Sequence, residues 1–496
     1  MSPFRSLIPI SFAAVLLAGA LVAVPASSAK KNGTFSDTGS MIAGSTFGTQ
    51  TRLQDGRVLF VGGESFSTGP LVKLSSAEIY DPKSKTFAAT GSMAVPRNNP
   101  TATVLDDGKV LIVGGTPETY AEIYDPATGS FSRSGSMAEA RALHTASLLN
   151  DGRVLVAGGE SPSTRATLQS AEIYDPKTGT FKATGSMTVP RRIQTASVLQ
   201  DGSVLLTGGT SSVSQPERAG LYEALNSAEL YNPKKSRFVS TGAMSTARYD
   251  HRASPLRDGT VLVTGGWRGG QTQASTERYK PSKRKFVRDA SMSMGRAAHS
   301  ASVGYYQGQE YVLVANGFFG TSPDDFGIDG SGESYNPYDK TFRTVGGMST
   351  DRRGQVSTVL RDRNILFAGG VAFPDTPNVA ELYKPVAAPG TVTDVMRADV
   401  AMARATVTWK KPRRDGGAKV TNYQYRIKKK GKSWQDWNGK KKKKLKVSGT
   451  STYSKTFRKL KKGKKLKPNT KYVIELRGKN DAGGGPNQKV SFRTQR

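Results

Sequence analysis

Short apolar runs and polar turns alternate along most of the chain in one repeated order. The stretch from Leu148 to Met187 shows it: an apolar run ends in Gly-Gly at 158–159, a segment alternating small or apolar with larger polar residues follows at 171–176, and an aromatic segment begins near Phe181. Apolar and β-branched runs bounded by Gly, Asp and Pro are typical of strands. With a further apolar run before the first turn, each repeat predicts four strands joined as a meander.

Three landmarks count the repeats. Gly-Gly, once replaced by Asn-Gly, stands at 62–63, 114–115, 158–159, 208–209, 265–266, 316–317 and 369–370. The Glu of an E-x-Y step follows at Glu78, Glu122, Glu172, Glu229, Glu277, Glu333 and Glu381. A Phe comes next at Phe87, Phe131, Phe181, Phe238, Phe286 and Phe342. No seventh Phe follows Glu381, and the matching segment stands instead at Phe35, with no complete repeat in front of it.

This split repeat predicts a closed ring. A strand from one end of the segment can pair with strands from the other end, which leaves no free sheet edge. Four-stranded units that recur at this spacing are typical of propeller blades. We therefore predict an all-β fold whose main part is a seven-bladed β-propeller, closed by the N-terminal strand around Phe35 pairing with strands near Glu381.

The landmarks carry a family resemblance. Gly-Gly, E-x-Y-D-P and the fourth-strand aromatic resemble Kelch repeats in the galactose oxidase-like arrangement, over about residues 33–385. The resemblance implies a Kelch-type propeller. It implies no single function, because Kelch propellers include both enzymes and binding platforms.

Both ends of the chain differ from the repeats. Residues 1–29 hold one early Arg, an apolar run and a Ser-Ser-Ala step, the pattern of a cleaved secretory signal, while the propeller is expected over 30–386. We therefore expect a secreted protein, with cell-wall association as a further possibility and no membrane span after signal cleavage. Cysteine is absent, so disulfides and thiolate chemistry are excluded.

A second domain is expected after a short linker at 387–390. An early Trp409, an L-x-P-x-T-x-Y segment ending at Tyr472 and a later N-x-A-G resemble a fibronectin type III domain, a β-sandwich, over 391–496. This part has 32 Lys and Arg against 6 Asp and Glu. Its lysine runs are expected on loops, where they would hold an anionic cell-wall polymer or glycan by charge alone; the alternative is a soluble spacer that binds nothing. The proposed polyanion-binding residues are Lys440, Lys441, Lys442, Lys443, Lys444, Lys461, Lys462, Lys464 and Lys465.

One face of the ring is expected to meet a ligand. The loop from Gly-Gly to the next Glu varies from 7 to 20 residues, whereas the D-G and D-P turns of the opposite face are nearly constant. The variable face also carries an Arg in six units, where unit one has Ser45. The candidate ligand-binding residues are Arg97, Arg141, Arg191, Arg248, Arg296, Arg352, Trp267 and Arg268. The alternatives are that each Arg bonds loop carbonyls and that Trp267 packs over a blade end.

No metal or cofactor is expected. The oxidase branch of the Kelch resemblance implies a copper centre with a Cys cross-linked to a Tyr, a Tyr-His pair and a later His. The chain has no Cys and no His after His299. His144, His251 and His299 share one position of the repeat, which the repeat consensus itself explains.

These patterns lead to one hypothesis with two alternatives. The first is a secreted, non-catalytic protein that binds an extracellular carbohydrate or cell-surface polymer, with no catalytic residue assigned and no specific nucleic acid as partner. The alternatives are a glycosidase in polysaccharide degradation and a scaffold that binds a surface protein. A glycosidase would need two carboxylates from the variable loops. If the chain is an enzyme, a glycosidase is favoured over a copper radical oxidase.

Overall fold

The structure is a computed structural model. It describes residues 33–493, except for 66–70, 212–221, 307–308, 323–324, 373–376, 386–392, 402–403, 411–419, 421, 431–437, 442–451, 458–465, 468, 481–482 and 485–487. The predicted signal peptide at 1–29 and the linker at 387–390 lie outside these residues. No helix in the described part is long and apolar enough to cross a membrane.

Seven four-stranded antiparallel sheets make up the first part of the chain. Their first strands are β2 (Thr49–Arg52), β8 (Thr101–Val104), β12 (Thr145–Leu148), β16 (Thr195–Val198), β20 (Arg252–Pro255), β26 (Ser300–Tyr306) and β32 (Val356–Val359). The second strands are β3 (Val58–Val61), β9 (Val110–Val113), β13 (Val154–Ala157), β17 (Val204–Thr207), β21 (Val261–Thr264), β27 (Gln309–Ala315) and β33 (Ile365–Ala368).

The outer half of each sheet completes the meander. The third strands are β6 (Ala77–Asp81), β10 (Tyr120–Asp125), β14 (Ala171–Asp175), β18 (Ala228–Asn232), β24 (Thr276–Lys280), β30 (Gly332–Asn336) and β34 (Ala380–Pro385). The fourth strands are β7 (Thr86–Ala89), β11 (Ser130–Ser136), β15 (Thr180–Ala183), β19 (Arg237–Ser240), β25 (Lys285–Arg288), β31 (Thr341–Thr344) and β1 (Gly33–Asp37). One 3-10 turn, η2 (Pro281–Lys283), joins β24 to β25.

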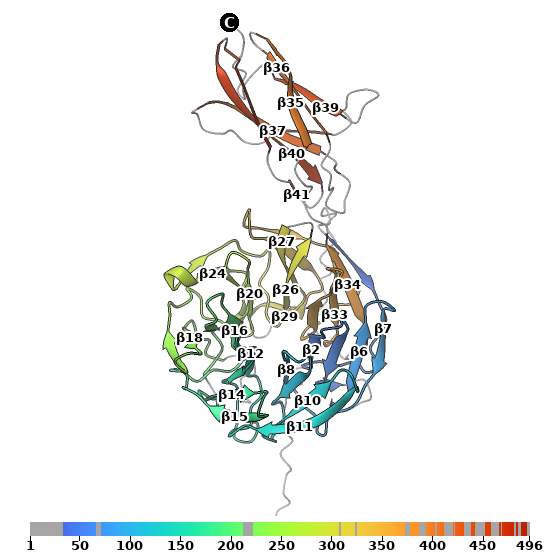
Figure 1. Ribbon diagram of the computed structural model, residues 1–496, viewed down its shortest axis with the longest axis vertical. Helices are drawn as coiled ribbons and strands as arrows, with labels where there is room; N and C mark the ends of the chain where they lie inside the picture. The colour runs from blue at the N-terminus through green and yellow to red at the C-terminus, as the bar shows by residue number, and fades with distance from the viewer. Residues whose placement is uncertain are drawn as a thin grey trace, which may run out of the picture.

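The seven sheets stand in a circle (Figure 1). Each first strand contacts the first strand of the next sheet in chain order, and β32 contacts β2. The last sheet has the order β1-β34-β33-β32, so its outer strand comes from the other end of the segment. Phe35 pairs with Tyr383 and Asp37 with Glu381, which is the pairing that the split repeat predicts.

Apolar second strands and aromatic pairs build the core. The second strands are almost wholly buried and pack between neighbouring sheets. In every sheet a fourth-strand Phe lies against the Tyr of E-x-Y, with ring centroids 4.8 to 5.1 Å apart. In the last sheet Phe35 supplies this ring, so the repeat that is split in the sequence is complete in space.

On the variable face, three of the loops that follow Gly-Gly form short β-hairpins. They are formed by β4 (Glu64–Ser65) with β5 (Val72–Lys73), β22 (Trp267–Arg268) with β23 (Gln271–Thr272), and β28 (Phe318–Ser322) with β29 (Asp325–Ile328).

The second domain contains two sheets. One holds β35 (Thr393–Ala401), β36 (Arg404–Lys410) and β39 (Thr452–Phe457); the other holds β38 (Asn438–Lys441), β37 (Asn422–Lys429), β40 (Lys471–Asn480), β41 (Gly483–Gly484) and β42 (Gln488–Arg493). Trp409 is 1% exposed in the core between them. The Tyr472 hydroxyl accepts a hydrogen bond from the Lys467 amide at 2.9 Å, the contact expected of a tyrosine corner.

The lysine runs are only partly loops, contrary to the sequence-based expectation. Lys428 and Lys429 lie in β37, and Lys440 and Lys441 lie in β38. The alternating Tyr423, Tyr425 and Ile427 fill the core, so the strand continues through the charges that follow. Lys442 to Lys444 and Lys461 to Lys465 lie outside the described residues.

Candidate functional site

The six arginines expected to meet a ligand are buried, with 0% of each residue exposed. Arg191 is typical, because it pairs with Glu229 at 3.0 Å and donates to the carbonyls of Gly208 and Ser227, both at 3.0 Å. Five of the six pair with the Glu of E-x-Y in this way, whereas Arg296 pairs with Asp329 at 2.5 Å. These guanidinium groups hold the loop after Gly-Gly against its sheet. The ligand-binding assignment is therefore corrected for all six, since no ligand can reach them in this structure.

The three histidines are also internal and stand apart, one to a sheet. Each Nε2 lies near a threonine hydroxyl: His144 is 3.0 Å from Thr101, His251 is 3.0 and 3.1 Å from Thr195 and Thr207, and His299 is 2.9 Å from Thr264. Burial lowers the pKa of His144 to about 3 and lowers those of His251 and His299 well below the usual range. All three are neutral at pH 7 and serve the packing of the first strands.

A rim of seven residues surrounds the centre of the ring on the variable face. These residues lie two positions after each Arg, or after Ser45, and each has a positive φ between 49° and 63°. We call them the mouth: Phe47, Asn99, Leu143, Ile193, Asp250, Ala298 and Gly354. The amide of Asn99 donates to the carbonyl of Phe47 at 2.8 Å and that of Ala298 to Asp250 at 3.1 Å, so rim residues bond across sheets. These bonds offset the left-handed backbone, which L-residues rarely adopt.

Asp250 is the one charged residue of the mouth. Its carboxylate is 27% exposed and lies 3.6 Å from the guanidinium of Arg252. Its pKa is raised by burial, although Arg252 and Arg353 act in the opposite direction. Arg353 also interacts electrostatically with Glu64, and burial lowers the pKa of its guanidinium to about 10. A partly exposed carboxyl whose pKa is raised by burial, beside a guanidinium group, is a candidate for proton transfer.

Next to the mouth lies a cluster built around Glu160, which is 2% exposed. It pairs with Arg165 at 2.6 Å and with Arg192 from the next sheet. The Arg192 guanidinium lies 4.7 Å from the centroid of Tyr222, and Tyr222 and Tyr249 pack edge to face at 5.4 Å. This cluster joins two sheets on the face that also holds the mouth.

Trp267 and Arg268 form β22 on the same face. Trp267 is partly exposed and packs against Phe318 at 5.7 Å, and the Arg353 guanidinium lies 4.2 Å over Phe318. The Phe318 ring therefore contacts both Trp267 and Arg353, and Arg353 interacts electrostatically with Asp250 of the mouth. A ligand role for Trp267 and Arg268 stays a prediction.

Sequence reasoning missed Asp250. Its position is filled by seven different residue types, of which only Asn, Asp and Gly are favoured in a left-handed backbone, so the repeat gives no consistent signal of the rim. Two of the variable-loop carboxylates have structural partners: Glu64 accepts a hydrogen bond from Asn98 at 2.8 Å, and Glu160 is paired as described. Glu217 and Asp324 lie outside the described residues.

Comparison with known proteins identifies the second domain. Residues 390–494 match the Fibronectin type III domain, which confirms that part of the sequence-based prediction. No curated protein matches the chain. Among solved structures, the chain is similar to a fungal alcohol oxidase described as having catalytic diversity among the AA5 family, in complex with copper. The identity is 13%, the TM-score is 0.56, and the match covers 94% of this chain and all of that one.

This likeness contradicts two expectations. A non-catalytic binding protein was favoured, and a glycosidase was favoured over a copper oxidase, whereas the similar solved structure is that of a copper-bound oxidase. At 13% identity the likeness shows the fold alone, so the residues of this chain must be tested for copper. They do not fit, because the sequence has no Cys and the three histidines point to threonines in separate sheets. Among the residues that the structure describes, no three His, Asp or Glu side chains gather to hold a metal ion.

Proposed function

We propose that this chain is an exported enzyme on a seven-bladed Kelch-type propeller, with its reaction centre at the mouth. The repeat landmarks and the circle of four-stranded sheets support the propeller assignment. The observation that carries the functional proposal is Asp250, a half-buried carboxyl with a raised pKa at the centre of the variable face. The likeness to an oxidase supports catalysis rather than passive binding.

The chemistry assigned to the mouth is proton transfer with a small polar substrate. Asp250 exchanges a proton with the substrate, and its raised pKa keeps the protonated form accessible closer to neutral pH. Arg252 and Arg353 favour the negative charge that remains when the proton has left. Because the donor set does not fit copper, the proposal includes no step on a metal.

Asp250→Asn tests this assignment. The amide keeps the shape of the side chain and removes its titratable proton, so we expect turnover to fall by roughly 10² to 10⁴-fold, the range typical of a general acid or base. Turnover is first sought by NMR on a panel of sugars, sugar acids and polyols, with and without added copper. The matched control is Asp151→Asn, since Asp151 lies in a D-G turn of the opposite face. Full turnover by Asp250→Asn, or turnover that appears only with copper, would reject the assignment.

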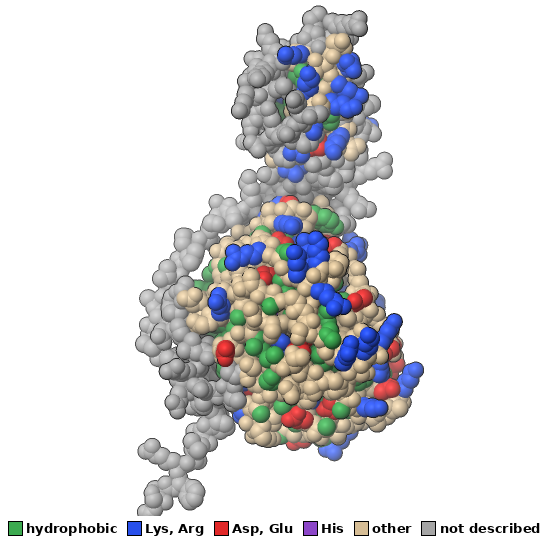
Figure 2. Space-filling view, turned by 90° about the vertical axis from the view of Figure 1, so that its left-hand side faces the viewer, with side chains coloured by type: hydrophobic (Ala, Val, Ile, Leu, Met, Phe, Trp, Pro, Cys, Tyr) green, Lys and Arg blue, Asp and Glu red, His purple; other side chains and the backbone are tan. Residues whose placement is uncertain are grey.

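We also propose an anionic extracellular polymer as the partner of the second domain. Glu475 is the one acidic residue in strands β37, β40 and β42; it is buried and already paired with Arg426 at 2.6 Å and Lys489 at 3.3 Å. Lys471 stands opposite Arg493, and both are exposed. Like charges directly opposite destabilise a sheet, so their presence favours a role in binding. Figure 2 shows Lys and Arg side chains over the described part of this domain.

Replacing Lys471 and Lys489 together with Gln tests this partner. Binding by summed charge weakens with each lost cation and with salt, so we expect the double variant to elute from immobilised dextran sulfate at a clearly lower salt concentration than the wild type. Lys177→Gln with Lys182→Gln, in the first part of the chain, removes the same charge and is expected to change elution less. Equal elution of both variants would show that total charge, rather than this sheet, holds the polymer.

A further inference from the structure

One unit of the ring lacks the arginine that the other six contain. Ser45 takes its place, in the segment that leads from β1 to β2. The backbone is equivalent, because the Ser45 carbonyl accepts from the Gly370 amide at 2.8 Å as the Arg97 carbonyl accepts from Gly63 at 2.8 Å. The exchange is therefore one of side chain alone.

The shell that surrounds each buried guanidinium is still present in this unit. In the unit of Arg141, that shell is the carbonyls of Gly158 and Ser170 and the carboxylate of Glu172, at 3.0 to 3.1 Å. The corresponding groups here are the carbonyls of Gly62 and Ser76 and the carboxylate of Glu78. Ser45 reaches one of them, since its hydroxyl donates to the Gly62 carbonyl at 2.7 Å.

Glu78 consequently has no cationic partner among the described residues. It is 5% exposed, and its two oxygens accept from the amides of Ile42 and Ala43, both at 2.8 Å. Five of the equivalent glutamates pair directly with an arginine. A buried carboxylate without a counterion is costly, because amide dipoles replace only part of the lost hydration.

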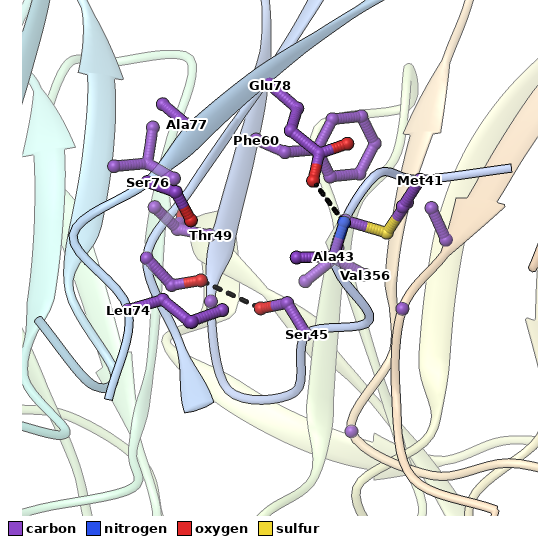
Figure 3. Close-up of a pocket in the computed structure, with 16 residues that line it drawn as sticks. Met41, Ala43, Ser45, Thr49, Phe60, Leu74, Ser76, Ala77, Glu78 and Val356 are labelled. Carbon is purple, nitrogen blue, oxygen red and sulfur yellow. Dashed lines mark hydrogen bonds between the residues drawn. The ribbon is translucent and has the colours of Figure 1, made fainter. Parts of the chain in front are cut away.

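A pocket occupies the place of the missing side chain. Figure 3 shows Ser45, Ser76 and Glu78 around it, with Phe60 and Met41 on the apolar side. Ala43, Ser45 and Ser76 are partly exposed, whereas the six arginines are fully buried, so this pocket can be reached from the surface.

We propose that this pocket binds a guanidinium group. Six internal copies of the same shell already hold a planar guanidinium between one carboxylate and backbone carbonyls. A guanidinium presents donors in a fixed plane to such a set, and its apolar stem would lie against Phe60 and Met41. The source is either a free small cation or an arginine side chain of a peptide, which share this chemistry. The site lies at the junction of the first and last sheets, and Gly354 of the mouth is among its lining residues.

Calorimetric titration of the full chain with methylguanidinium tests the proposal. We expect saturable binding in the millimolar range or tighter, and at least tenfold weaker binding of methylammonium, which lacks the planar donors. Ser45→Arg is expected to abolish methylguanidinium binding, because its own side chain fills the pocket. The matched control is Ser45→Ala, which leaves the pocket open and is expected to retain binding.

Thermal unfolding gives a second, independent measurement on the same variants. Ser45→Arg is expected to raise the melting temperature, since it supplies the missing ion pair, and methylguanidinium is expected to raise it only in the wild type and in Ser45→Ala. An N-acetylated arginine amide binds as well if the source is a peptide, and fails to bind if the site takes free cations only. Equal methylguanidinium binding by the wild type and Ser45→Arg, or no saturable binding by the wild type, would overturn the proposal.

Discussion

Removal of the side chain of Phe35 is expected to lower the free energy of unfolding by about 3 kcal/mol, although Phe35 lies at the start of the described chain. The ring packs against Tyr383 at 5.1 Å and Phe367 at 5.4 Å. These partners lie 332 (Phe367) and 348 (Tyr383) residues further along the sequence. Phe35→Ala therefore leaves a cavity where the two ends of the ring meet.

Deletion of residues 33–37 is expected to destabilise the protein more than Phe35→Ala. The deletion removes all five residue pairs between β1 and β34 and leaves β34 as an open edge, which invites association with other chains. Urea denaturation followed by tyrosine fluorescence measures the stability, and light scattering measures the association.

The matched control is the double variant Thr34→Ala with Ser36→Ala. Both side chains are exposed on β1, so we expect a loss within about 0.5 kcal/mol. A deletion variant as stable and monomeric as the wild type would mean that β1 is not required to complete the last sheet.

Acid is expected to destabilise the ring through its three histidines. Their pKa values are lowered in the folded state and return to about 6.5 on unfolding, so the unfolded state binds protons that the folded state cannot. Stability from these groups is complete above pH 6.5 and is lost as the pH falls from 6.5 toward 3. For His144 alone the shift to about 3 corresponds to roughly 5 kcal/mol by pH 3.

The triple variant with Gln at 144, 251 and 299 isolates this effect. Gln already occupies the equivalent position at Gln194, where its amide donates to the Ala157 carbonyl at 2.9 Å. We expect the variant to lose less stability than the wild type between pH 7.5 and 4.5 in urea denaturation. The carboxylates titrate in both proteins, so the difference between the two profiles reports the histidines. Parallel pH profiles would show that the histidines are protonated without unfolding.

Much of the fold was predictable because the repeat states it seven times. Apolar runs, Gly-Gly and turn residues predict the same four strands in every unit, so a strand assignment that is ambiguous in one unit is settled by the equivalent segments of the others. The pairing of Phe35 with Tyr383 followed from the one landmark that was out of place. The placement of Lys440 was not predicted, because charge runs resemble loops even when a strand passes through them.

The site was less predictable, since it depends on differences between units. The arginine series is visible in the sequence, but its burial comes from ion pairs with glutamates about 25 to 40 residues away. Asp250 stands at a position without a residue preference in the repeat. Its place at the mouth became visible only when the backbone angles of the seven equivalent positions could be compared. Ser45 was visible as a break in the series, and the structure adds the glutamate that the break leaves without a cation.

A cross-link between the two ends of the ring tests the central claim, that β1 completes the sheet of β34. Thr34 and Lys384 are paired and both exposed, and the chain contains no native cysteine. In the variant with Thr34→Cys and Lys384→Cys, a short bifunctional maleimide is expected to join the two residues, so that a protease cut between them leaves the fragments linked. In a control with Thr34→Cys and Lys177→Cys, Lys177 lies in the turn between β14 and β15 of another sheet, and the two fragments are expected to separate after a cut between residues 34 and 177. Equal separation of both variants would contradict closure of the ring by β1.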